Sequence, residues 1–242
     1  MTAAQPELGS ERTTSLSQRP IQRERMKAAQ DVAASLAREL RNPVFAIASA
    51  SQLLRYRVSD DPVIEKNIGR ILREADRLNA YVTALLEYSA PTPLRLTPGD
   101  PDDVWSDVIT HQRGDLESRA ILAHHTPAEP RATCSLDAEQ LARTFASALA
   151  NAIEAAPEGS DIGVRSVATD DGLWVCVVHN DGPPIDDETL ARAFEPLVTT
   201  KPGHAGIGLA VAQRIVVDHG GAVALRSDGA GATLTITLPL HG

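Results

Sequence analysis

An asparagine within a helical pattern is the first residue of this chain whose type and position could do chemistry. The run LANAIEA at residues 149–155 is apolar on one side and carries Asn151 at its centre. Asparagine slightly disfavours a helix, so one found there often has another role. Its side-chain oxygen can coordinate Mg²⁺, a hard cation that takes oxygen ligands. Taken alone, the pattern also fits a solvated or capping asparagine.

A second polar residue ends a predicted strand. The run VVHNDGPPI at residues 177–185 alternates like a strand and then turns through Asp181 and Gly182. A polar side chain at such a strand end, here Asn180, can hydrogen-bond the edge of a base at the mouth of a pocket. By itself the run is also simply a good turn signal.

Glycines before a predicted helix form the third feature. The run GHAGIGL at residues 203–209 follows Lys201. Glycines there let backbone N–H groups approach a phosphate, and the N-terminus of a helix favours anions. Lys201 adds a mobile positive charge, although a single Gly-x-Gly before a helix is weak evidence. The fourth feature is the closing strand GATLTITLP at residues 231–239, where Thr233 can offer a hydroxyl to the base.

The order and spacing of these four features resemble the N, G1, F and G2 boxes of the histidine-kinase catalytic domain, within the gyrase, Hsp90 and MutL ATPase superfamily. The resemblance covers about Leu96 to Leu240 and implies an α/β sandwich that binds ATP and Mg²⁺ under a lid from Leu190 to Gly206. It assigns Mg²⁺ to Asn151 and a structural role to His219. The residues that it assigns to ATP are Asn151, Glu154, Asn180, Gly182, Ile185, Thr200, Lys201, Gly206, Ile207, Gly208, Leu209 and Thr233.

Four positions depart from the family pattern. Asn180 stands where an aspartate usually accepts a hydrogen bond from the adenine amino group; an amide oxygen can still accept it, without charge assistance. Pro184 and His204 replace glycines, and Ser147 replaces an expected asparagine. We expect ATP or ADP to bind, at an affinity that these replacements can lower.

A second motif lies in the N-terminal half. The run LARELRNPV at residues 36–44 resembles the dimerisation and phosphoacceptor motif of histidine kinases, commonly His-Glu-Leu-Arg-Asn-Pro-Leu, with Arg38 at the histidine position. Glu39 matches the acid/base residue of that motif, and Asn42 matches a position tied to phosphate removal. An arginine stays protonated and offers no lone pair to attack phosphorus, whereas a neutral imidazole does.

Heptad patterns predict the elements that carry this motif. Apolar residues step by four and three through two helical segments: Leu36, Leu40, Pro43, Ile47, Ala50 and Leu54, and then Ile64, Ile68, Ile71, Ala75, Leu78, Val82 and Leu85. Two such helices joined by a short polar turn predict an antiparallel hairpin, and a dimeric four-helix bundle would complete its core. The seam places position 38 at the exposed f position, and Pro43 is expected to bend the helix.

The rest of the pattern predicts an α+β fold with two domains. We expect a disordered segment at residues 1–20, the hairpin at residues 21–90 and the ATP-binding domain at residues 96–242, with a boundary at APTP, residues 90–93. Helices are expected at 102–116, 135–156 and 206–218, and strands at 161–168, 173–179, 222–226 and 233–238.

The charge, apolar content and cysteines of the sequence indicate the cellular location and the kinds of partner to expect. A formal net charge of −9 argues against a general nucleic-acid or anionic-membrane surface. No apolar run approaches the roughly 20 residues of a membrane helix, and the polar N-terminus carries no secretory signal. Cys134 and Cys176 have no metal-like spacing and are expected to be reduced core thiols. We expect a cytoplasmic protein without membrane or direct nucleic-acid partners.

Three functions remain open at this point. The first is a two-component signalling protein that resembles a cytosolic sensor histidine kinase and binds ATP and Mg²⁺. Arg38 would prevent its autophosphorylation, leaving a pseudokinase or a kinase that acts on a partner's histidine, as a homodimer or as a heterodimer with another histidine kinase. The second is an active ATPase or a protein kinase with a different acceptor. Ser147 argues against efficient ATP hydrolysis, because gyrase-like ATPases carry a water-activating glutamate there. The third is a non-enzymatic scaffold that binds a response regulator.

Overall fold

The computed structural model describes residues 19–57, 61–89, 93–201 and 205–240. Nearly all of the predicted disordered segment lies outside these residues, although Arg19 and Pro20 already belong to the first helix. The predicted boundary residues 90–92, and His204, also lie outside the described chain.

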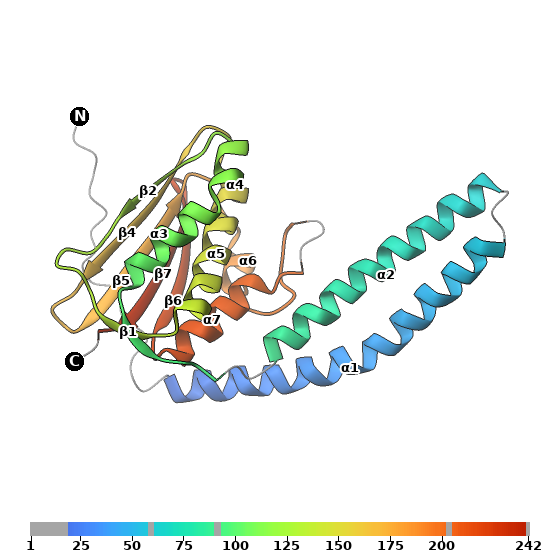
Figure 1. Ribbon diagram of the computed structural model, residues 1–242, viewed down its shortest axis with the longest axis horizontal. Helices are drawn as coiled ribbons and strands as arrows, with labels where there is room; N and C mark the ends of the chain where they lie inside the picture. Colours follow the sequence, from blue (N-terminus) through green and yellow to red (C-terminus); the bar gives the residue numbers. More distant parts are fainter. Residues whose placement is uncertain (1–18, 58–60, 90–92, 202–204, 241–242) are drawn as a thin grey trace.

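Two long antiparallel helices form a hairpin that projects from the remainder of the molecule (Figure 1). Helix α1 spans Arg19–Arg57 and α2 spans Pro62–Ser89. Asp61 caps α2, because its Oδ1 accepts hydrogen bonds from the backbone N–H groups of residues 63 and 64 at 2.8 and 3.3 Å. Pro43 lies inside α1, which visibly bends along its length in Figure 1.

The contact between α1 and α2 differs from the predicted seam. On α1 the buried residues are Ala33, Ala37, Val44 and Ser51, whereas the predicted Leu36, Leu40, Ile47 and Leu54 are 44–53% exposed. On α2 one half of the predicted seam is buried, at Ile68, Ala75, Val82 and Leu85. The other half is exposed, with Ile64 at 37% and Ile71 and Leu78 at 43%. In a helical bundle, the heptad pattern identifies apolar residues that contact any of the neighbouring helices. The period alone therefore did not show which of these residues contact the other helix of the same chain.

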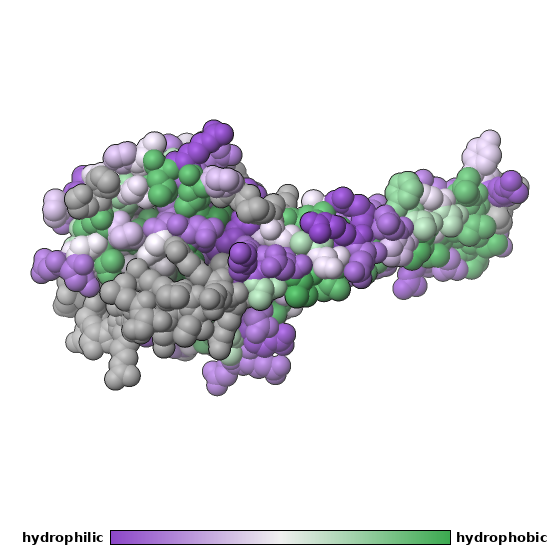
Figure 2. Space-filling view, turned by 90° about the horizontal axis from the view of Figure 1, so that it is seen from below, coloured by the Kyte–Doolittle hydropathy of each residue, from purple (hydrophilic) through white to green (hydrophobic). Residues whose placement is uncertain are grey.

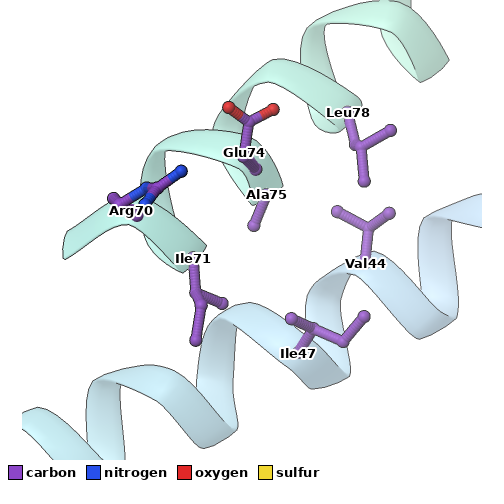
Figure 3. A pocket seen from close by; sticks show the side chains of 7 residues that line it. All are labelled: Val44, Ile47, Arg70, Ile71, Glu74, Ala75 and Leu78. Atoms are coloured by element: carbon purple, nitrogen blue, oxygen red, sulfur yellow. The ribbon is translucent and has the colours of Figure 1, made fainter. Parts of the chain in front are cut away.

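An apolar groove runs along the exposed side of the hairpin. Its walls come from both helices: Val44, Ile47, Arg70, Ile71, Glu74, Ala75 and Leu78. Figure 3 shows the aliphatic side chains of the two helices facing one another, with Arg70 and Glu74 at the edge. In Figure 2 hydrophobic surface recurs along the hairpin between hydrophilic patches.

The C-terminal part is a mixed sheet covered on one face by helices. The strands are β2 (Leu122–Thr126), β4 (Asp161–Ala168), β5 (Leu173–Asn180), β6 (Ala222–Asp228) and β7 (Gly231–Pro239). They form a five-stranded sheet in the order β2-β4-β5-β7-β6, in which only β2 and β4 pair in parallel. Strands β1 (Thr97–Gly99) and β3 (Cys134–Leu136) form a separate two-stranded sheet.

Three helices cover the sheet face that looks toward the hairpin (Figure 1): α3 (Pro101–His111), α5 (Ala138–Ala155) and α7 (Gly208–Asp218). Two short helices, α4 (Arg113–Ser118) and α6 (Asp187–Ala191), complete the domain. None of the described helices is long and apolar enough to span a bilayer.

The core lies between the sheet and these helices. Trp105 of α3 stacks on Phe145 of α5 with ring centroids 4.3 Å apart, and Phe145 lies 6.0 Å from Trp174 of β5. Both cysteines are buried and free, and burial raises the pKa of each thiol to about 12, as expected for core thiols. Burial alternates strictly along β5, so every second residue from Trp174 to Asn180 faces this core.

The predicted fold class is confirmed: a helical hairpin is followed by an α/β sheet domain. Three local predictions need correction. The helix expected at 102–116 divides at Gln112 into α3 and α4. The helix expected from residue 135 begins after Asp137, whose carboxylate accepts from the Gln140 N–H, while Cys134–Leu136 pairs with β1. Strand β2 was missed, because its residues LAHHT lack a β-branched alternating pattern.

Candidate functional site

The last turns of α5 meet β5 and α7 at one end of the domain. A Cβ placed on Gly182, just after β5, would lie 2.7 Å from the backbone oxygen of Ala155 and 2.6 Å from Asn180 Nδ2. A Cβ on Gly208, the first residue of α7, would lie 2.6 Å from Ser147 Oγ. Helix α5 is therefore the common neighbour of the turn after β5 and of the start of α7.

At two of the predicted glycines, the backbone geometry leaves no room for a side chain. At Gly182 any side chain would collide with the α5 backbone, so the close approach requires glycine. Gly206 has a φ of +64°, and its Cβ would lie 2.6 Å from the backbone oxygen of Val198. That oxygen belongs to the segment before α7, and the Leu197 N–H also donates to the Gly206 oxygen at 2.9 Å. Both glycines thus allow close backbone contacts in the loops that border the predicted nucleotide site.

The two predicted asparagines carry side-chain atoms without partners. Asn180 is only 5% exposed, and its buried Nδ2 has no hydrogen-bond partner in the described structure. Asn151 is half-buried on α5, and no described residue hydrogen-bonds its side chain. Buried polar groups are normally paired, so Asn180 Nδ2 lacks a partner that the described residues do not supply.

Lys201 and Glu154 tie the segment before α7 to α5. Lys201 Nζ lies 2.5 Å from Glu154 Oε2, and both side chains are about one-third exposed, at 33% and 38%. Both residues were predicted at the nucleotide. The structure brings them together as an ion pair beside Asn151, one turn along the same helix.

The prediction for Thr233 needs correction. The register pairs Asn180 with Ala232 and His179 with Thr233, so Thr233 lies on the opposite face of the sheet from Asn180. There His179 Nδ1 lies 2.9 Å from Thr233 Oγ1. Ala232 occupies the position beside Asn180, because successive strand residues face opposite sides of a sheet.

Other predicted nucleotide residues lie around the site with packing contacts of their own. The Ile185 N–H donates to Ser227 Oγ at 2.9 Å, which anchors the turn after β5 to β6. Thr200 is exposed. Leu209 packs on the domain core, and Ile207 packs in a different cluster that includes the hairpin.

A contact between α7 and the base of the hairpin was not predicted. Ile207 and Ala210 share one apolar cluster with five hairpin residues: Ala33, Ala37, Val82, Leu85 and Tyr88. Buried Arg214 donates from Nη1 to the Tyr88 backbone oxygen at 2.6 Å, near the C-terminus of α2, where a cation is favoured. The sequence signal for this contact was an arginine within the mostly apolar stretch AVAQRIVV of residues 210–217.

This cluster includes the residue that precedes Arg38. Ala37 is fully buried in the cluster that holds Ile207, and the following residue, Arg38, is exposed. The predicted exposure of position 38 is confirmed. Glu39 and Asn42 are exposed on the same helix, and Ser35 Oγ donates to Glu39 Oε1 at 3.4 Å.

His219 has the structural role that was predicted for it. Its Nδ1 donates to the Ile215 oxygen at 2.7 Å and its Nε2 accepts from the Asp137 N–H at 2.9 Å, so the neutral ring links α7 to the start of α5. Burial lowers the pKa of His219 below its ordinary value.

We predict a pH-dependent stability from this ring. The unfolded chain takes up a proton near pH 6.5 that the buried ring resists, so the contribution of His219 to the free energy of unfolding is constant above about pH 6.5 and falls below it. Denaturant unfolding at pH 8.0 and at lower pH would measure this decline. It should be shallower in His219→Asn and unchanged in the control His111→Asn, an exposed histidine. An equal decline in all three proteins would contradict the assignment.

Comparison with known proteins agrees with both parts of the chain. Residues 136–242 match the family of histidine kinase-, DNA gyrase B- and HSP90-like ATPases. Residues 28–93 match the His Kinase A (phospho-acceptor) domain. Sensor histidine kinase ZraS of Salmonella typhimurium is 31% identical over 219 residues, which are 90% of this chain and 47% of that protein. This chain therefore spans about half the length of that relative.

Two solved structures show the same fold over most of the chain. Histidine kinase ThkA in complex with the response regulator TrrA superposes with a TM-score of 0.65 at 24% identity, covering 96% of this chain and 68% of that one. Full-length ShkA in complex with AMPPNP gives a TM-score of 0.61 at 24% identity, covering 87% and 46%. The chain thus matches a His Kinase A phospho-acceptor domain over residues 28–93 and a histidine kinase-, DNA gyrase B- and HSP90-like ATPase domain over residues 136–242, in the same order as its fold.

Proposed function

We propose that this protein binds ATP with Mg²⁺ and cannot phosphorylate itself at the usual position of its hairpin. The observation that carries the proposal is Arg38, exposed on the turn of α1 that packs against the start of α7. In the family that position holds the histidine that accepts phosphate. A guanidinium is always protonated and has no free lone pair, so it cannot attack phosphorus.

The residues at the end of α5 fit a nucleotide with its metal ion. The Asn151 side-chain oxygen supplies one ligand of the kind that Mg²⁺ takes, and phosphate oxygens and water would complete the shell. Lys201 provides a positive charge for phosphate, and the close backbone approaches at Gly182 and Gly206 require glycine at both positions. ShkA, which shares the fold, is solved with the ATP analogue AMPPNP.

The exposed face of the hairpin supports dimerisation as a second part of the proposal. Leu36, Leu40, Ile47 and Leu54 of α1 and Ile64, Ile71 and Leu78 of α2 leave large apolar side chains in contact with solvent. A second hairpin, from another copy or from another histidine kinase, would bury them in a four-helix bundle. We also propose a response regulator as partner, as in the ThkA–TrrA complex. Such a protein acts either as a pseudokinase or on the histidine of its dimer partner.

Nucleotide titration tests the proposed site. We expect a fluorescent ATP analogue to bind saturably and more tightly with Mg²⁺ than without it. Asn151→Ala should weaken the Mg²⁺-dependent binding by at least about tenfold, because it removes an oxygen ligand. Thr233→Ala is the matched control: its side chain lies on the other face of the sheet, so binding should not change. Absence of saturable binding to the wild type would refute the proposed function.

A further inference from the structure

The C-terminal end of α5 is held by a side chain from outside the helix. The last carbonyl groups of a helix have no partner within it, and α5 ends at Ala155. Arg119, which follows α4, donates from Nη1 to the Ile153 oxygen and from Nη2 to the Ala156 oxygen, the latter at 2.9 Å. A guanidinium is planar and carries paired donors, and a cation is favoured at the C-terminus of a helix. Arg119 therefore caps α5 from another part of the chain.

The turn of α5 that Arg119 caps also borders the candidate site. In an α-helix each N–H bonds the oxygen four residues earlier, so the N–H of Ala155 bonds the backbone oxygen of Asn151. In the same turn Glu154 pairs with Lys201, and the Ala155 oxygen lies against Gly182. Loosening of this one turn would therefore disturb the proposed metal ligand together with both of its neighbouring segments.

Arg119 is itself fixed by backbone hydrogen bonds. Its oxygen accepts from the Gly159 N–H at 3.0 Å, and its N–H donates to the Leu116 oxygen at 3.2 Å. Gly159 lies in the turn after α5, and Leu116 belongs to α4 and is buried in the domain core. The guanidinium thus reaches α5 from an anchored point, so it restrains the end of the helix.

We infer that Arg119 is a positioning residue of the proposed nucleotide site: it holds the last turn of α5 so that Asn151 meets Mg²⁺. The inference rests on the proposed function and adds to it a residue that acts through the helix. Without the guanidinium, the Ile153 carbonyl loses its donor and the turn frays more readily. Nucleotide binding is then weakened, and more so with Mg²⁺ than without it, because the oxygen ligand stands on that turn.

Nucleotide titration of Arg119 variants tests this role. We would measure the Kd of a fluorescent ATP analogue, with and without Mg²⁺, at a temperature where thermal unfolding shows each variant to be folded. Arg119→Ala should weaken binding with Mg²⁺ by about five- to tenfold, and binding without Mg²⁺ by less. Arg119→Lys keeps the charge and loses the paired donors, so a smaller loss of about threefold is expected. It decides the question alone if Arg119→Ala does not fold.

Gln112→Ala is the matched control. Gln112 Nε2 donates to the Ala146 oxygen at 2.9 Å, so it also bonds a carbonyl of α5 from outside, but earlier in the helix. This variant should lower the unfolding temperature and keep the wild-type Kd. An equal loss of affinity in Gln112→Ala, or wild-type affinity in the folded Arg119 variants, would overturn the inference and leave the nucleotide site standing.

A double-mutant cycle with Asn151→Ala shows whether the effect passes through the metal ligand. If Arg119 positions Asn151, then Arg119→Ala should cost less affinity in the Asn151→Ala background than in the wild type. Full additivity of the two losses would contradict the positioning role. Failure of the wild type to bind any nucleotide would overturn both the inference and the proposed function.

Discussion

Arg38→His, incubated with γ-labelled ATP and Mg²⁺, is expected to become labelled, whereas the wild-type chain stays unlabelled. The substitution exchanges a permanently protonated group for an imidazole with a neutral nitrogen near pH 7. The surroundings are already in place: position 38 is exposed, Glu39 follows it, and the adjacent Ala37 packs with Ile207 at the start of α7. The expected gain is from no phosphorylation to a measurable rate.

The controls separate the alternatives. Arg41→His makes the same exchange at another exposed position of α1 and should stay unlabelled. The label on Arg38→His should be lost in acid and kept in base, as expected for phosphohistidine. Label on the wild type would show a different acceptor and contradict the lost-acceptor proposal. An unlabelled Arg38→His that still binds ATP would show that more than the nucleophile is missing.

Leu78→Glu is expected to convert a dimer into monomers. Leu78 lies in the exposed apolar groove of the hairpin and is 43% exposed in the single chain. Burying an unpaired carboxylate in an interface costs about 3–5 kcal/mol. Two-fold symmetry applies this cost twice, so the dimer should weaken by more than roughly a thousandfold. Light scattering or sedimentation at micromolar concentration would measure the change.

Ala80→Glu is the matched control for this variant. It adds the same charge to the same helix two residues later, at an exposed position almost opposite the groove on the helical wheel. It should leave the dimer intact. A wild type that is monomeric, or equal dissociation of both variants, would contradict the proposed role of the groove.

The sequence by itself was sufficient to determine the helical hairpin, the ATPase-type domain and most of their elements. Heptad spacing, the Asp61-Pro62 helix start and the alternating strands are local signals, and the structure follows them. The residue types at Arg38, Asn151 and Asn180 also carried their chemistry directly, because a guanidinium or an amide is the same group in any fold.

Only the tertiary structure decided which faces meet. It assigned the small residues Ala33 and Ala37, which lie outside the predicted seam, to the contact within the chain and left the seam residues Leu36 and Leu40 exposed. The strand register placed Thr233 on the face away from Asn180. The packing of Ile207 and Arg214 against the hairpin base joins residues more than a hundred positions apart. Such contacts depend on how completed elements dock, and a period along one element carries no information about its partner.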